Sequence, residues 1–213
     1  SIITCKKLGS AATYTTKFTR WYSETRSDLF QKIHYFKWEK AHRSGSVPKI
    51  GDSILNGILK KLNGYPTTFA QKITKKGTHK VFYHNAPLYW IRGSKFSPYF
   101  YNERDGEGTS SQYKSICVND EKTSNLLLAV LNSSLFYLWF VVYGDMRHFN
   151  KREIEIFPWC AVSDEMNQKL SQLLDELMAD YEKHKTRKEC IYGNTGLVIY
   201  DEYHPKSSKR FMD

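Results

Sequence analysis

The alternation of apolar and polar residues along the 213-residue chain predicts several β-strands. Residues 13–19 alternate in the way that favours a strand. Residues 81–83 and 88–91 flank His84-Asn85-Ala86-Pro87, a sequence typical of a turn, so a β-hairpin is expected there. Residues 113–118 predict a further strand.

Two amphipathic helices are predicted from apolar residues that recur every three or four positions. Asp52 is the expected N-cap of the first helix, whose apolar positions are Ile54, Leu55, Ile58, Leu59 and Leu62. The second extends from Ser163 to about Glu189, and its apolar face comprises Met166, Leu170, Leu173, Leu174, Leu177, Met178 and Tyr181. We expect this face to pack on the domain, although pairing with another helix would use the same residues.

The most apolar segment, residues 125–143, predicts a helix that is apolar nearly all round. Its length approaches the roughly 18 to 20 residues that a membrane span needs. Polar residues at 132–134 interrupt it, charges flank it, and the mean hydropathy of the chain is −0.58, so we expect burial in a core and no membrane insertion. Gly144 is expected to end this helix, and Asn150 with Glu153 match a capping box that begins a short helix.

Together these elements predict an α/β fold of the α+β kind. We expect a twisted, mostly antiparallel sheet packed with the buried helix, and a long C-terminal amphipathic helix along one side. Residues 102–112 are rich in Asp, Gly, Ser and Thr, which predicts an exposed and mobile loop. The expected organisation is an entry segment at 1–50, a central domain at 51–160, and a helix with an extension at 161–213.

The composition supports a folded chain and adds a first functional indication. Hydrophobic residues make up 40% and charged residues 25% of the chain, which suffices for a packed core. The 32 Lys and Arg against 22 Asp and Glu give a net charge of +10 and a pI near 9.3. Such a balance favours an anionic partner, most commonly a phosphate backbone, although solubility alone could account for it.

The remaining residue types exclude several classes of protein. Cys5, Cys117, Cys160 and Cys190 are scattered without a Cys-x-x-Cys pair or a histidine at metal-ligand spacing, so we expect reduced cysteines and no metal site. The first residues lack the apolar stretch of a secretory signal, which favours a cytoplasmic protein. The abrupt start without Met and the Lys-Arg-Phe-Met-Asp ending suggest a piece of a longer polypeptide.

No catalytic motif is visible in the sequence. It contains no Gly-x-Ser-x-Gly, no Gly-x-x-x-x-Gly-Lys and no His-Glu-x-x-His, and no Glu-x-Lys of the kind found in metal-dependent nuclease cores. The seven histidines stand apart from acidic or cysteine partners along the chain. We therefore predict no catalytic residues, and an enzymatic site would have to be assembled by folding.

Basic and hydrogen-bonding residues recur with aromatic ones in three stretches, which predicts nucleic-acid contacts. The first could grip phosphates or simply form a solvated turn: Lys72, Lys75, Lys76, His79 and Lys80. The second could also reach base edges, although some of its tyrosines should be core: Arg92, Lys95, Tyr99, Tyr101, Arg104, Ser110, Ser111, Gln112, Tyr113 and Lys114. The third lies where exposed helix amides would attract phosphate: Arg147, His148, Lys151 and Arg152.

Three motifs in order carry a resemblance to a known family. Leu131-Asn132-Ser133 in an apolar helix, then Gly144-Asp145, then Lys151-Arg-Glu-Ile-Glu-Ile-Phe-Pro158 resemble the target-recognition region of restriction-modification adenine-specific DNA methyltransferases. Weaker similarity extends upstream through Trp21-Tyr22 and Val47-Pro-Lys-Ile50, and downstream to the C-terminal extension, so it covers most of the chain.

The resemblance implies that residues 51–160 form a target-recognition domain and that double-stranded DNA is a partner. The family's Asn-Pro-Pro-Tyr catalytic motif and its glycine-rich methyl-donor motif are absent. A parent enzyme would therefore supply the missing catalytic domain, bind S-adenosylmethionine and methylate a flipped adenine, while no cofactor is expected in the present chain. Base contacts are not carried over, because the family's recognition residues differ from target to target.

Two alternatives remain open at this stage. A specificity subunit of a multisubunit restriction system would share the helix-to-proline ending and the long helix, although the segment beyond Glu189 fits single-chain enzymes better. A basic RNA-binding or protein-interaction module is compatible with the charge and the aromatic residues, and a preference for single strands would support it.

Overall fold

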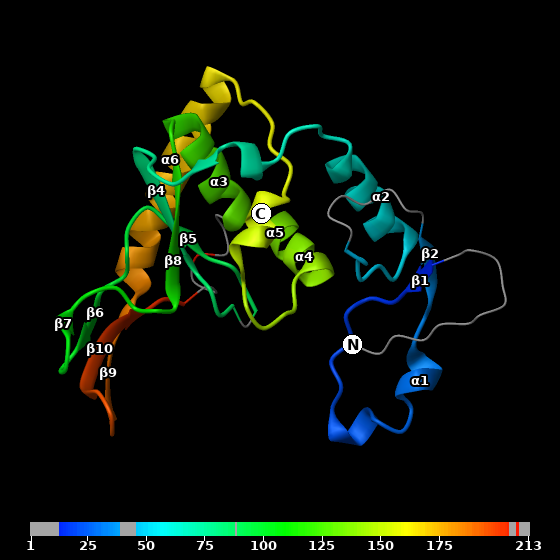
Figure 1. Ribbon diagram of the computed structural model, residues 1–213, viewed down its shortest axis with the longest axis horizontal. Coiled ribbons are helices and arrows are strands. Elements are labelled where there is room, and N and C mark those ends of the chain that lie inside the picture. The colour runs from blue at the N-terminus through cyan, green and yellow to red at the C-terminus, as the bar shows by residue number, and fades with distance from the viewer. Residues whose placement is uncertain (1–12, 39–45, 88, 205–207, 209–213) are drawn as a thin grey trace.

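The computed structural model describes residues 13–38, 46–87, 89–204 and 208 (Figure 1). It confirms the predicted α/β class, with antiparallel sheets packed against helices. The helices are α1 (Leu29–Lys32), α2 (Ser53–Asn63), α3 (Glu121–Leu131), α4 (Ser134–Tyr143), α5 (Lys151–Glu155) and α6 (Asp164–His184).

The strands within these described residues form three antiparallel sheets. The central sheet has the order β3-β8-β4-β5 and comprises β3 (Ile73–Thr74), β8 (Tyr113–Val118), β4 (His79–His84) and β5 (Gly93–Ser94). A second sheet has the order β7-β6-β10-β9 and comprises β7 (Gly106–Glu107), β6 (Phe100–Asn102), β10 (Gly196–Glu202) and β9 (Thr186–Tyr192). A two-stranded sheet of β1 (Thr13–Thr15) and β2 (Phe36–Trp38) lies near the N-terminus.

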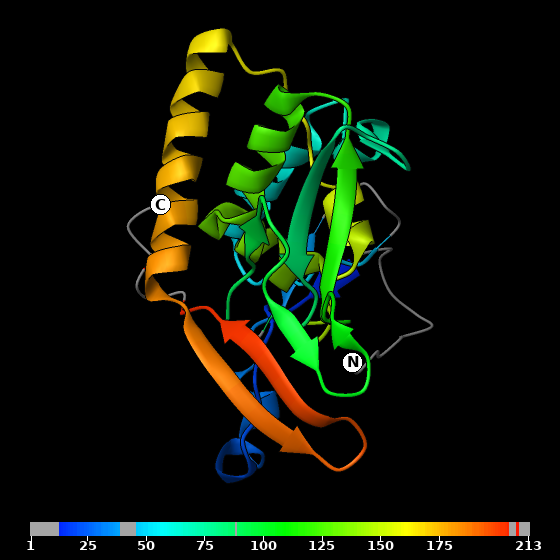
Figure 2. The ribbon, with the colours of Figure 1, turned by 90° about the vertical axis from the view of Figure 1, so that its left-hand side faces the viewer.

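The core lies between the central sheet and the helices. Helix α3 contacts β4, β5 and β8 on one side and α6 on the other. Figure 2 shows α6 standing beside α3, with the β9-β10 hairpin continuing beyond its end. The buried side chains come from β4, β8, α3, α4 and α6 and include Val81, Ile116, Leu127, Leu131, Trp139 and Leu177. Burial of such apolar surface is the main term that stabilises the fold.

Several predicted helix ends are confirmed. The Asp52 carboxylate accepts from the Leu55 amide at 2.8 Å and so caps α2. Gly144 ends α4, and Ser163 caps α6 through the Met166 amide. The capping box of α5 is formed, because the Asn150 amide donates to Glu153 Oε2 at 2.8 Å. These caps satisfy backbone groups that a helix cannot pair internally.

The prediction of one continuous helix over residues 125–143 is wrong. The chain breaks at Asn132 and Ser133, and α3 and α4 are bent relative to each other by 72°. The Asn132 side chain turns inward to bond backbone and side-chain groups, while Ser133 caps α4. Within the described residues, no single helix is long and apolar enough to cross a membrane.

Three other elements differ from their predictions. The hairpin partner of β4 is β5 at residues 93–94, and β4 pairs along its whole length with β8. Residues 102–112 are partly ordered, because β7 pairs with β6 around Gly106, whose φ of +80° suits glycine. The long helix ends at His184, and residues 186–192 form an edge strand, β9, that pairs with β10 along seven positions.

Candidate nucleic-acid interface

The β4-β8 ladder separates a core face from an outer face. Alternate residues point to opposite sides of a sheet, and Val81 lies opposite Ile116 on the buried side. On the outer face three cross-strand pairs follow one another along the ladder: Lys80 with Cys117, Phe82 with Ser115, and His84 with Tyr113. The His84 and Tyr113 rings lie 5.2 Å apart. The outer face therefore presents polar and aromatic groups in a regular row.

Three segments meet where β4 ends and β8 begins. The Asn85 amide donates to the Gln112 carbonyl, and the Phe149 amide donates to the Asn85 carbonyl, both at 2.8 Å. The side chains of His84 and Gln112 are also 3.1 Å apart, Nε2 to Oε1. The two backbone hydrogen bonds of Asn85 therefore bring the second and third basic stretches of the sequence together. We name the set His84, Gln112, Lys114, Arg147 and His148 the ladder end.

The ladder end offers exposed hydrogen-bonding and basic groups. Gln112, Lys114, Arg147 and His148 are exposed, and His84 is half-buried. Within the described part of the chain, the side chains of Lys114 and Arg147 form neither ion pairs nor hydrogen bonds with the protein. A glutamine can bond an adenine edge and an arginine a guanine edge or a phosphate. The set therefore has the donors and acceptors needed to contact both bases and backbone.

The loop that carries Arg147 is held by Asp145. The Asp145 carboxylate accepts from the Arg147 amide at 2.8 Å and from the His148 amide at 2.7 Å. Partial burial pulls the pKa of Asp145 upward, but these two amide bonds, together with the charge and side-chain hydrogen bond of His148, leave the pKa below its usual value. Met146 has a φ of 61°, an uncommon conformation for a residue other than glycine. The loop is thus a defined turn beside the ladder.

Lys151 and Arg152 follow this loop but are already engaged. Lys151 pairs with Glu155 at 2.8 Å, and Arg152 bonds Ser46. The capping box also occupies amides at the start of α5, so the expected attraction of phosphate to free helix amides there is not supported.

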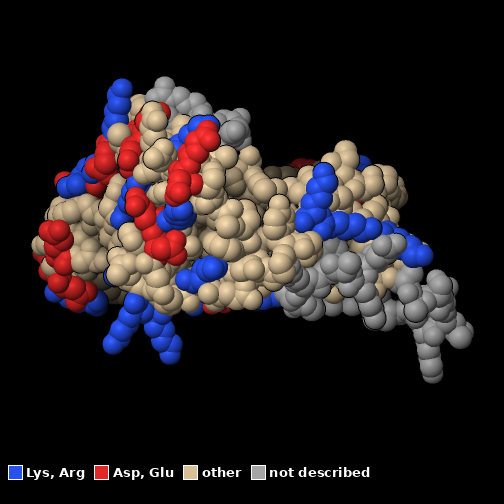
Figure 3. Space-filling view, turned by 90° about the horizontal axis from the view of Figure 1, so that it is seen from above, with Lys and Arg blue, Asp and Glu red and all other residues tan. Residues whose placement is uncertain are grey.

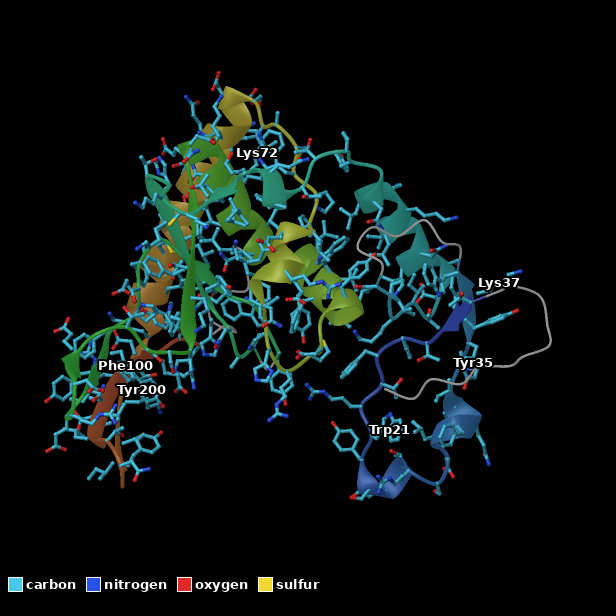
Figure 4. All side chains as sticks on the ribbon, in the orientation of Figure 1. Trp21, Tyr35, Lys37, Lys72, Phe100 and Tyr200 are labelled. Carbon is cyan, nitrogen blue, oxygen red and sulfur yellow. The ribbon has the colours of Figure 1, made fainter. Side chains whose placement is uncertain are left out.

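The first basic stretch lies at the opposite end of the ladder. Lys75 and Lys76 are exposed in the turn between β3 and β4, and Lys80 is exposed on the outer face. Lys72 stands over the Trp159 ring at 3.8 Å, near the top of the molecule in Figure 4. Gly77 keeps this turn tight, because a Cβ there would meet the Val118 carbonyl oxygen at 2.3 Å.

The remaining members of the second stretch lie outside the ladder end. Arg92 is half-buried over the Tyr203 ring at 4.2 Å, and burial lowers its pKa to about 10. Lys95 pairs with Asp175 at 2.6 Å, and Arg104 pairs with Asp105 at 2.8 Å. The others occupy neighbouring positions: Ser110 Oγ accepts from the Gln112 amide, Ser111 is exposed, Tyr99 lies under Arg187, and Tyr101 is in β6.

Two residues of this region were not among the predicted contacts: His84, a member of the ladder end, and Asn85, whose backbone joins its segments. The sequence pattern places both in a hairpin turn, since no property of the isolated sequence shows that β4 pairs mainly with β8. The pairing of Asn85 with Gln112 and Phe149 is long-range, so only the folded chain shows it.

Charge is mixed over one face of the molecule. Figure 3 shows basic and acidic side chains interspersed on the face seen from above. An open hollow of about 470 Å³ lies between β6, β10 and the end of α6, and Lys185 and Arg187 in it both pair with Asp201. Among the described residues, no group of three His, Cys, Asp or Glu side chains is placed to hold a metal ion.

Comparison with known proteins gives no relative: no family model, no curated protein and no solved structure matches this chain.

Proposed function

We propose that this chain is a sequence-specific DNA recognition domain that serves an adenine-specific DNA methyltransferase of a restriction-modification system. The observation that carries the proposal is the convergence at the ladder end. Gln112 just before β8, His84 at the end of β4, and the loop after α4 that carries Arg147 and His148 are joined through Asn85. The exposed Lys114 lies next to them in β8, opposite Tyr83 and so on the other face of the ladder from His84. Base recognition needs such mixed donors and acceptors on a rigid support.

The motifs that resemble the methyltransferase family support the proposal by their structural role. Asn132 is buried at the break between α3 and α4, and the Trp139 indole donates to the Glu153 carbonyl at 3.1 Å. Pro158 forms a bridge with Thr68, and the Phe69 amide donates to the Phe157 carbonyl. The motif residues thus form the frame that holds the loop at 145–149 against β4, while the exposed residues are free to differ with the target.

The ladder has dimensions that suit duplex DNA. A strand rises about 3.3 Å per residue and DNA about 3.4 Å per base pair. The six residues of β4 therefore extend over roughly the length of five to six base pairs. In this arrangement the ladder end contacts bases, and Lys75, Lys76 and Lys80 contact phosphates at the other end.

Selection of binding sites from random duplex DNA tests the proposal. The full chain is titrated with duplex across a salt series, and the bound pool is sequenced after repeated rounds. We expect salt-dependent binding and enrichment of a short motif. A variant with Gln112→Ala, Lys114→Ala and Arg147→Ala should lose the enrichment, whereas Lys169→Ala on the exposed face of α6 is the matched control.

Two outcomes would contradict the proposal. The first is that the chain does not bind duplex DNA at low salt, even when an adenine methyltransferase domain is added in the same polypeptide. That result would contradict DNA recognition as the function. Enrichment that survives the triple variant would move recognition away from the ladder end. Methylation restored by a separately added methyltransferase subunit would favour the multisubunit alternative.

A further inference from the structure

Residues 13–38 form an N-terminal arm that leaves an unusual number of aromatic rings in solvent. Trp21, Tyr22, Phe30 and Tyr35 are all exposed, with Phe30 and Tyr35 each at 63%. Only Thr15 and Leu29 are buried within the arm. Figure 4 shows Trp21, Tyr35 and Lys37 along the arm, on the opposite side of the molecule from Phe100 and Tyr200. A large group of exposed aromatic side chains commonly marks an interaction site.

Arg20 links the exposed rings of the arm to an exposed ring outside it, Tyr89. The Arg20 guanidinium lies 5.0 Å from the centre of the Tyr89 ring, and Tyr89 is 71% exposed. Its hydrogen bond to Tyr89, followed by smaller contributions from Tyr22, raises the pKa of Arg20 above its usual value. We name the set Arg20, Trp21, Tyr22, Phe30, Tyr35 and Tyr89 the arm surface.

The charges of the arm favour an anionic occupant. The arm carries five Lys and Arg against Glu24 and Asp28. Both acids are engaged locally, since Ser23 donates to Glu24 at 2.7 Å and Lys32 pairs with Asp28 at 3.3 Å. Within the described part of the chain, Lys17, Arg26 and Lys37 have no ion pair. Lysine is depleted at the centre of protein interfaces, so the exposed Lys17 and Lys37 of the arm fit a polyanion better than a protein.

Rings and cations together select single strands over duplex. The Trp21 and Phe30 rings meet edge to face at a centroid distance of 6.4 Å, which leaves ring surface available for stacking. Only unpaired bases present their faces to a protein, and their phosphates then lie within reach of neighbouring cations. We propose that the arm surface binds single-stranded nucleic acid by stacking bases on its rings, at a site separate from the ladder end.

The test is titration of the full chain with a fluorescein-labelled oligothymidine of about 15 nucleotides. We expect binding that weakens with salt, and a loss of affinity between about 5-fold and 150-fold in each of Trp21→Ala and Tyr35→Ala. Arg26→Ala should lower the slope of affinity against salt by about 0.7. Tyr192→Ala, which removes an exposed ring from the β9-β10 hairpin, is the matched control. All four side chains are exposed, so folding should be unaffected, which a urea transition verifies.

Three results would overturn the proposal. The first is no binding of the oligonucleotide at low salt. The second is an equal loss in Tyr192→Ala and in the arm variants. The third is a loss of oligonucleotide binding in Lys114→Ala, which would place the strand at the ladder end. Failure of duplex recognition alone, with the arm variants behaving as expected, would contradict the proposed function and leave this inference intact.

Discussion

The Tyr181 hydroxyl of α6 donates to Oδ1 of Asn132, at the break between α3 and α4, across 2.7 Å. The same amide oxygen accepts from the Gly93 amide, and the amide nitrogen donates to the Gly93 and Leu128 carbonyls. One buried side chain therefore ties together a helix break, strand β5 and the long helix. Its hydrogen-bonding groups are all used, which is the condition for burying a polar residue without a large cost.

We expect Asn132→Leu to lower the free energy of unfolding by about 3 kcal/mol or more, because it strands the Tyr181 hydroxyl and the Gly93 groups in the core. Tyr181→Phe removes one bond and should cost about 1 kcal/mol. Urea denaturation measures both, with Tyr192→Phe on the exposed hairpin as control. If Asn132→Leu were as stable as the parent chain, the network would not hold the break.

Glu153 allows a matched pair of substitutions in the capping box. It is buried, and burial raises the pKa of its carboxyl despite the bond from the Asn150 amide. Glu153→Gln keeps an acceptor for that amide without the charge, so we expect stability at pH 7 within about 0.5 kcal/mol of the parent or higher. Glu153→Ala should cost about 1 to 2 kcal/mol, since the amide loses its partner.

The acid dependence of stability should include a contribution from Asp145. Its pKa is lowered in the folded chain, so its contribution is present above the unfolded pKa near 4 and is lost as the pH falls through the folded value. Asp145→Asn should therefore flatten the decline in stability between about pH 5 and pH 3. Urea midpoints across this range measure the effect, which should be small because the carboxyl is half exposed. An unchanged slope in Asp145→Asn would contradict this account of the loop.

Arg92 should matter more through its packing than through its charge. It lies over the Tyr203 ring, and burial lowers its pKa to about 10. Burial disfavours the charged form of Arg92 in the folded state. The free energy of unfolding should therefore rise as the pH increases through about 10. At pH 7 we expect Arg92→Met, which keeps the length, to remain within about 1 kcal/mol of the parent. Arg92→Ala should cost more, about 1 to 2 kcal/mol, because the Tyr203 ring loses the side chain that packs over it. Thermal or urea unfolding compares the two, and equal losses in both would show that the charge dominates.

Phosphate and base contacts should separate along the ladder. Lys75→Ala combined with Lys76→Ala should weaken duplex binding for all sequences and reduce the slope of log affinity against log salt by about 2. Gln112→Ala should instead relax the selected motif at one position, with a discrimination loss of about 1 to 3 kcal/mol. Binding isotherms at several salt concentrations and sequencing of the selected pool distinguish the two. A motif change in the lysine variant would reverse the assignment.

Local signals in the sequence predict the helix ends well and the sheet pairing poorly. Asp52, Gly144, Asn150 and Ser163 act through neighbours within four residues, so their roles follow from the chain itself. The β4-β8 pairing joins residues 29 to 39 positions apart, and apolar alternation is equally satisfied by either partner of β4.

The other errors have equally physical causes. The break at Asn132 depends on bonds to Gly93 and Tyr181, which are distant in sequence. Strand β9 was missed because its exposed, charged residues resemble the last turns of a solvated helix. The three stretches are predicted from their basic, hydrogen-bonding and aromatic residues, whereas only the folded chain shows that Lys95 and Arg104 form ion pairs while Lys114 and Arg147 do not.

The pairing of β6 with β10 determines when this sheet can form during synthesis of the chain. Tyr101 pairs with Ile199, so β6 leaves the ribosome almost a hundred residues before its partner exists. Until β10 is synthesised, β6 has only the two-residue β7 beside it and carries an open edge, which is a site for unwanted pairing between chains. Completion of this sheet is therefore a late event, and a chain released before β10 is complete should be prone to aggregation even though the central sheet and helices α3 to α6 are already present.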